Sequence, residues 1–301
     1  AQGATGTIRK SMPMRASIHN LRRSPVLLAA FSAASAIIGV ALIRRARRRH
    51  REQCAIDALA CRVQVKPSAL LEAHALDLTG FQLEDGSDGL AISAIVRESS
   101  ALTELYLWNN RFTRVTAGTL ANSLRRNKCV RRLWLSRNPL ADPGVQRLAS
   151  ALMANRDLRD LRLARCDMTC VGATSLALAL KAGLRLMELH LSANKIAAAG
   201  AIAIAQALPQ CATLEFLALN SNSIDEEGAL AIGEVLPMAT VVELWLGANP
   251  LGDKGATAVA EGALGGPVER LSLVDAGLSE DGIAALQQHH VWSSGFRCLS
   301  I

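Results

Sequence analysis

The sequence predicts an α/β solenoid, in which a parallel β-sheet is lined by α-helices. The first observation is a nine-residue motif with apolar residues at positions one, four and six. It returns every 27–29 residues, a period typical of repeat architectures. The second observation is a helical apolar pattern that follows the motif. The motif starts at Ala73, Leu102, Val130, Leu158, Leu186, Leu214, Val241, Val268 and, as a stub, Phe296.

The first 51 residues differ in charge from the rest of the chain. They contain eleven Lys and Arg residues and no Asp or Glu, whereas residues 52–301 contain 22 basic and 26 acidic residues. The formal net charge of +7 therefore belongs to this leader, and the remainder carries a net charge of −4. Because the remainder is mildly acidic, we expect no nucleic-acid partner for it.

An uncharged apolar stretch, residues 26–43, lies inside the leader. As a helix it would be ~27 Å long, close to the thickness of a hydrocarbon core of about 30 Å. Arginines are denser after the stretch than before it, which favours a cytosolic location for the chain that follows. The sequence therefore predicts a transmembrane helix at residues 26–43 that anchors the repeat domain on the cytosolic side of a membrane.

Two other interpretations of the leader stay open from the sequence. Residues 7–24 contain Arg and Ser but no acidic residue, which is typical of an organellar presequence and would direct the chain to the mitochondrion or another organelle. Alternatively, the apolar stretch is a helix that packs on the repeat domain.

The change of charge at residue 52 also indicates a domain boundary. Residues 52–72 keep no repeat register, and Pro67 with Ser68 interrupts the chain before the first motif. We therefore divide the chain into a basic leader at residues 1–51, an N-terminal cap at residues 52–72 and a repeat domain at residues 73–301. The repeat domain holds about eight repeats and a terminal strand.

Each part of the repeat has a physical explanation. The motif alternates in the manner of a short strand whose leucines point into the core. An asparagine at position nine can bond the open backbone of the turn that leaves the strand. A glycine six residues later lets the following helix lie close to the sheet. The predicted asparagine ladder consists of Asn110, Asn138, Asn194, Asn222 and Asn249.

The repeats resemble the ribonuclease-inhibitor-like class of leucine-rich repeats. Residues 222–236 (NSIDEEGALAIGEVL) and 249–264 (NPLGDKGATAVAEGAL) are similar to repeats in the leucine-rich-repeat region of NOD-like receptors. The resemblance covers residues 66–301 and implies a horseshoe, with the parallel β-sheet on the concave face and the α-helices on the convex face. Since inhibitors, innate sensors and GTPase activators share these repeats, it leaves the function open among those classes.

The strands predict a binding surface on the concave face. Residues at positions three, five and seven alternate with inward leucines and must point outward. Three of the four tryptophans and the one tyrosine occupy such positions, and aromatic residues and Arg are enriched at binding hot spots. The predicted partner-binding residues are Tyr106, Trp108, Arg132, Trp134, Arg162, His190, Phe216 and Trp245. The competing interpretation is that neighbouring rings merely cover one another.

No sequence motif indicates catalysis. Residues 247–254 (GANPLGDK) resemble a phosphate loop but lack the Ser or Thr after the lysine. The seven cysteines form no C-x-x-C pair, so no metal site or cofactor is predicted. We therefore predict a non-catalytic scaffold that binds a protein partner. The alternatives are a GTPase activator resembling the Ran-activating leucine-rich-repeat family and a fragment of a larger NOD-like receptor.

Overall fold

A computed structural model describes the backbone of residues 25–288 and 298–301, with side chains for residues 40–287 and 298–301. Contacts within the chain divide it into two compact units, Ala1–Arg51 and Glu52–Ile301. The second unit contains all the strands that the structure describes.

Helix α2, Pro25–Arg62, contains the apolar stretch and continues without a break through six arginines at residues 44–51. The side chains at residues 25–39, which include most of the predicted span, lie outside the described residues, as do residues 7–24 of the suggested presequence. Within the described part of the chain, no helix is both long and apolar enough to cross a membrane. This finding overturns the predicted membrane anchor at residues 26–43 and the membrane-anchored location. The side chains described in α2 include the arginines, whose charge is costly in hydrocarbon.

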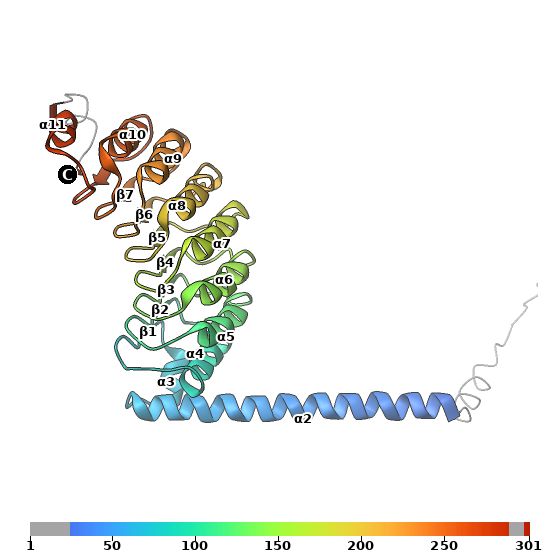
Figure 1. Cartoon of the computed structure of the whole chain (residues 1–301). Helices are drawn as coiled ribbons and strands as arrows, with labels where there is room; N and C mark the ends of the chain where they lie inside the picture. The colour runs from blue at the N-terminus through green and yellow to red at the C-terminus, as the bar shows by residue number, and fades with distance from the viewer. Residues whose placement is uncertain (1–24, 289–297) are drawn as a thin grey trace, which may run out of the picture. The chain divides into compact units, whose positions relative to one another are not determined.

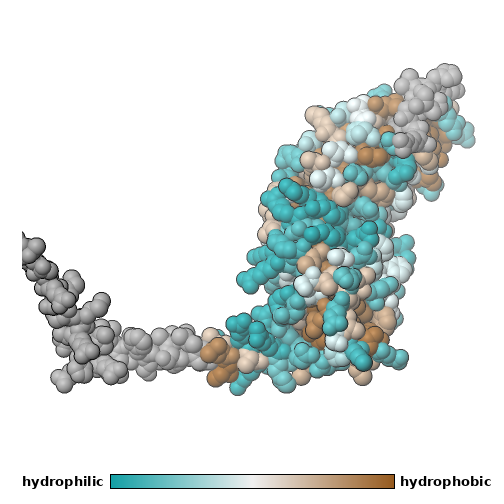
Figure 2. All heavy atoms as spheres, turned by 180° about the vertical axis from the view of Figure 1, so that it is seen from behind, coloured by the Kyte–Doolittle hydropathy of each residue, from teal (hydrophilic) through white to brown (hydrophobic). Residues whose placement is uncertain are grey.

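The strands of the second unit form one parallel sheet, and each strand pairs with its neighbours in sequence order. Figure 1 shows the strands along the inner side of a curved stack and the helices along its outer side. This arrangement confirms the predicted solenoid, and much of its surface seen from behind is hydrophilic (Figure 2). The strands are β1 (Ala75–Asp77), β2 (Glu104–Tyr106), β3 (Arg132–Trp134), β4 (Asp160–Arg162), β5 (Glu188–His190), β6 (Phe216–Ala218), β7 (Glu243–Trp245), β8 (Arg270–Ser272) and β9 (Cys298–Ser300).

A helix follows each strand from β1 to β8, so that strands and helices alternate along the stack. Short 3₁₀ helices follow two of them, η1 (Leu208–Gln210) after α8 and η2 (Leu236–Met238) after α9. The helices of the second unit after α2 are α3 (Pro67–Glu72), α4 (Ser87–Glu98), α5 (Arg114–Leu124), α6 (Ala141–Leu152), α7 (Cys170–Lys181), α8 (Ala197–Ala205), α9 (Glu226–Val235), α10 (Gly252–Leu264) and α11 (Glu280–Gln288).

The middle residue of each strand from β1 to β8 is buried, and in most of these strands the residues on either side are more exposed. In β2, Leu105 is fully buried, while Glu104 and Tyr106 on either side are half-buried. The middle leucines of neighbouring strands lie in register from β1 to β9, beginning with Leu76 beside Leu105. The sheet therefore turns one face of leucines toward the helices and presents the other face to solvent.

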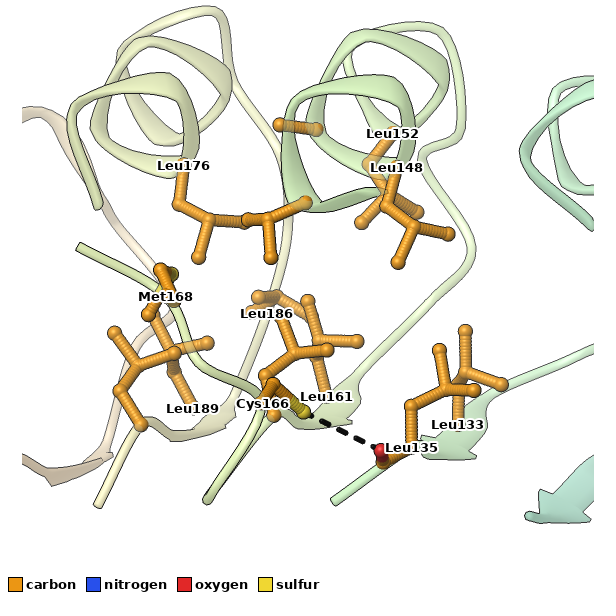
Figure 3. Packing of buried hydrophobic residues seen from close by; sticks show 14 of the residues in the cluster. Leu133, Leu135, Leu148, Leu152, Leu161, Cys166, Met168, Leu176, Leu186 and Leu189 are labelled. Atoms are coloured by element: carbon orange, nitrogen blue, oxygen red, sulfur yellow. Dashed lines mark hydrogen bonds between the residues drawn. The ribbon is translucent and has the colours of Figure 1, made fainter. Parts of the chain in front are cut away.

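The core lies between sheet and helices and is almost entirely aliphatic. Figure 3 shows Leu161 and Leu189 from the strands packed beneath Leu148 and Leu176 from the helices. Phe112 is an aromatic side chain that is completely buried there. Because aliphatic side chains fill most of the core, most of the described aromatic residues lie outside it.

The end of α2 covers the N-terminal end of this core. Ile56 and Leu59 are buried, and Glu52 forms a bidentate ion pair with Arg97 of α4, with nitrogen–oxygen distances of 2.9 and 2.7 Å. A bidentate ion pair adds geometric specificity to the charge attraction, so it fixes the orientation of the helix end. It holds the last turns of α2 against the first repeat.

Candidate functional site

Asparagines at position nine bond backbone groups of adjacent repeats. The Oδ1 atom of Asn194 accepts hydrogen bonds from the backbone of Cys166 and Met168, at 2.9 and 3.2 Å. Its Nδ2 atom donates to the carbonyls of Leu163 and Leu191, at 2.8 Å each. Each of these bonds satisfies a backbone group that the stack would otherwise bury unpaired. The same pattern is found at Asn110, Asn138, Asn222 and Asn249.

Cys166 takes the ninth position between two of these asparagines. It is completely buried, and its thiol lies 3.4 Å from the carbonyl oxygen of Leu135 (Figure 3). Burial raises the pKa of this thiol to about 12. At neutral pH the group is therefore a protonated packing residue that stands in the place of an asparagine.

A second row of asparagines was missed by the sequence analysis. Asn127 and Asn155 are buried before β3 and β4. The Nδ2 atom of each donates at 2.7 Å to a carbonyl in the helix of the preceding repeat, that of Val96 in α4 and that of Leu124 in α5. Their Oδ1 atoms accept from the backbone of Val130 and Leu158, at 2.8 and 3.0 Å. The signal was present in the sequence, because each lies three residues before a motif.

The concave face brings together seven of the predicted binding residues in adjoining rows. Tyr106 and Trp134 lie in register on β2 and β3, and Arg162 and His190 continue the same row on β4 and β5. Trp245 occupies that row on β7, separated from His190 by the small Ala218 of β6. Phe216 and Arg132 lie on the parallel row formed by position three.

The first half of this face is an aromatic and arginine cluster. The ring centroids of Tyr106 and Trp134 lie 4.5 Å apart with an interplanar angle of 60°. The guanidinium of Arg162 lies over the Trp134 ring, 3.9 Å from its centroid, in a cation–π contact. Tyr106 donates its hydroxyl to Glu104, which also pairs with Arg132 at 2.6 Å. These contacts fix the rotamers of the rings before any partner arrives.

Beneath this cluster, Asp160 is the buried anion of the face. It is 4% exposed, accepts a hydrogen bond from the indole nitrogen of Trp134 at 2.8 Å, and pairs with Arg162 at 3.1 Å. Arg162 also pairs with Glu188 at 3.1 Å. Since a buried unpaired carboxylate is expensive, Arg162 is a structural counter-ion as well as a surface residue.

Asp160, Glu188 and His190 could together supply ligands to a metal ion, because one ligand atom of each lies within 4.8 Å of the others. Arg162 already binds both carboxylates, and Trp134 binds Asp160. A cation would have to displace the guanidinium from both carboxylates to enter. The cluster is therefore best explained as an ion-pair network.

The second half of the face is a stack of three rings beside a hollow. His190 and Phe216 are stacked at 4.4 Å and 27°, and Phe216 meets Trp245 edge-on at 5.1 Å and 72°. Glu243 accepts from the Trp245 indole at 2.9 Å and also pairs with Arg270. A hollow of about 530 Å³ lies along these rings and extends to Arg132 and Arg159. Trp245 is 38% exposed, the most open of these rings.

Burial lowers the pKa of His190 below its ordinary value of 6.5, and the nearby positive charge of Arg162 lowers it further. Glu188, 3.4 Å from Nε2, acts in the opposite direction but does not outweigh them. The imidazole is therefore uncharged at neutral pH. Protonation of this histidine therefore belongs to the acidic side of neutrality.

Trp108 makes a cation–π contact with a different arginine. It belongs to position seven, beyond the end of β2, and stacks with Arg137 at 5.0 Å from its ring centroid. Arg270, which the sequence analysis did not select, lies on the position-three row of β8 beside Glu243. Arg270 is at position three of the motif that starts at Val268, so the sequence alone could have identified it.

Part of the repeat domain matches a known protein family. The family described as Leucine Rich repeat matches residues 126–149, 186–205 and 210–233. No curated protein matches the chain. The three matched segments support leucine-rich repeats, which agrees with the in-register parallel sheet of the α/β solenoid. Repeats of this kind suggest a protein-interaction scaffold.

Proposed function

We propose that this protein is a non-catalytic scaffold that binds a protein partner on the concave face. The binding surface consists of Tyr106, Arg132, Trp134, Arg162, His190, Phe216 and Trp245, with Trp108 at its edge. We name it the concave patch.

The observation that carries this proposal is the location of the aromatic residues. The core is filled mainly by Leu, Ile, Val and Ala, whereas Tyr106, Trp134 and Trp245 lie on the solvent side of the sheet. Rings and arginines held in fixed positions lose little conformational entropy on binding, which is why they dominate interface energetics. Ring-on-ring covering explains part of their burial, but Trp245 and Arg132 remain exposed.

The proposal also includes the subtype of the leucine-rich repeats and the division of the chain into domains. Repeats of 27–29 residues, each with a helix, support the ribonuclease-inhibitor-like subtype. The packing of Ile56 and Leu59 supports residues 52–72 as the N-terminal cap of a repeat domain at residues 73–301, with residues 1–51 as a separate leader. The GTPase-activator and receptor-fragment alternatives stay predictions from the sequence.

The proposal is tested by quantitative cross-linking of the full chain in cells, comparing the wild type with Arg132→Ala/Trp245→Ala. Both side chains are exposed, so their removal leaves the buried Asp160 with its counter-ion. We expect the variant to lose the cross-linked partners, with a Tm close to that of the wild type.

The matched control is Leu178→Ser, which removes an exposed side chain from helix α7 on the convex face. It should retain the partners. If the control loses them and the concave variant keeps them, the proposed location of the binding surface is wrong. Arg162→Ala is a poorer probe, because it strips the counter-ion from Asp160 and would lower stability as well.

A further inference from the structure

A groove on the convex side runs over α9 between α8 and α10. It has a volume of about 670 Å³ and is separate from the concave patch. Its apolar lining includes Ile202 of α8, Leu230 and Val235 of α9, and Ala258 of α10. Leu230 is 44% exposed, although folding alone would favour its burial. We name this surface the acidic groove, for the charges described next.

All charged residues that line the groove are negative. Glu227 and Glu234 of α9 and Glu261 of α10 are exposed at its edges, and none of them forms an ion pair with a residue that the structure describes. The one basic residue on α8, α9 and α10 is Lys254, whose amine lies 3.8 Å from Glu226. A hollow with apolar walls and charges of one sign concentrates its potential on a ligand of the opposite sign.

The floor of the groove is held rigidly by a close approach of two helices. A Cβ atom on Gly262 of α10 would lie 2.0 Å from the carbonyl oxygen of Gly233 of α9, so the two backbones are in direct contact. One on Gly233 would lie 2.4 Å from the carbonyl oxygen of Ala258. Because these contacts fix α9 against α10, the groove exists before any ligand binds, which lowers the entropic cost of docking.

We propose that the acidic groove docks a basic amphipathic helix of a partner protein. Apolar side chains of that helix, spaced three and four residues apart, would cover Leu230 and Val235, and flanking Lys or Arg residues would pair with the three glutamates. Helix α9 is ten residues long, about 15 Å, so roughly three turns of a partner helix would match it. The same glutamates repel phosphate, which disfavours nucleic acid and anionic lipid as occupants.

The test uses a fluorescent synthetic helix of about 18 residues, with Leu on one face and Lys on the other, titrated with the full chain. We expect saturable binding that weakens by about tenfold or more for Leu230→Ser and for Glu227→Gln/Glu234→Gln. The counter-probe, with Glu in place of Lys, should not bind. Matched controls are Leu178→Ser, at a 56% exposed leucine of α7, and Glu280→Gln at the start of α11. Each should change the Kd by less than about twofold.

Three outcomes would overturn the proposal: no binding of the Lys helix, equal binding of the Glu helix, or equal losses in controls and groove variants. If Leu230→Ser lowers the Tm, the double variant Glu227→Gln/Glu234→Gln is the deciding measurement. Its two glutamates are exposed and form no ion pair with a described residue, so they can be replaced without disturbing the core. Trp245→Ala should bind the Lys helix as the wild type does. A failure of the proposed helix binding at the acidic groove can therefore be distinguished from a failure of the proposed partner binding at the concave patch.

Discussion

At the scale of the residue, the molecule depends on buried amides that serve backbone groups rather than one another. Asn138 is completely buried, and it accepts from the backbone of Phe112 and donates to the carbonyls of Leu107 and Leu135, so one side chain joins two repeats. This role could be predicted from the sequence, because a polar residue at a fixed position of an apolar motif must satisfy backbone that the stack buries. The roles of Asp160 and Arg162 could not, since they depend on side-chain conformations across three strands.

Replacing Asn194 with alanine should lower the free energy of unfolding by about 1–3 kcal/mol, because four backbone hydrogen bonds lose their partner. The measurement is urea unfolding followed by circular dichroism. Asn122→Ala, at an exposed asparagine of α5, is the matched control and should change the free energy by less than about 0.5 kcal/mol. Equal effects of the two substitutions would contradict the role of the ladder.

His190 gives a prediction for pH. Its pKa is lowered in the folded state, so the unfolded chain takes up a proton more readily as the pH falls below the ordinary value of 6.5. Stability contributed by the neutral ring is therefore complete above that pH and declines below it. Thermal unfolding from pH 8 to pH 5 should show a growing loss in the wild type relative to His190→Gln. Parallel curves for the two proteins would mean that the ring titrates normally.

At the scale of the element, the sequence predicted strands and helices better than it predicted the turns between them. The eighth position of the motif has a positive φ in successive repeats, for example 58° at Asn109, 55° at Arg137 and 53° at Ala248. Glycine and asparagine, as at Gly80 and Asn109, are typical of a positive φ. The arginine and the alanine at the same position give no indication of it in the sequence. The stack imposes the turn through hydrogen bonds to the neighbouring repeat, such as Arg137 N to the carbonyl of Ala164 at 2.8 Å.

The contact between α9 and α10 gives a prediction at this scale. Gly262→Ala should destabilise the protein by about 1–3 kcal/mol, because overlap with the Gly233 carbonyl outweighs the gain in helix propensity. Gly118→Ala in α5 is the control, since its nearest neighbour is the mobile end of the Arg147 side chain. It should be neutral or stabilising in chemical unfolding. A stabilising Gly262→Ala would show that the two helices separate easily.

At the scale of the whole molecule, each described strand pairs with the strands next to it in sequence, so we expect stability to be a sum of repeat and nearest-neighbour terms. The repeat period and the charge change at residue 52 were both readable from the sequence, because each extends over many residues. The membrane anchor was wrong, since an apolar stretch alone does not define a span. Which side chains of the concave patch bond one another required the register and the rotamers.

This arrangement predicts which repeats lose stability when a residue at one end of the stack is replaced. Leu59→Ala removes a buried side chain where the end of α2 covers the first repeat, and a cavity of this kind costs about 2–5 kcal/mol. Amide hydrogen exchange should accelerate in β1 and α4, while the amides of β5 to β7 keep their protection, because no contact carries the loss directly to them. Leu161→Ala in the middle strand β4 should instead weaken protection on both sides of itself. Uniform acceleration through all repeats in the Leu59 variant would show that the solenoid unfolds as one cooperative unit.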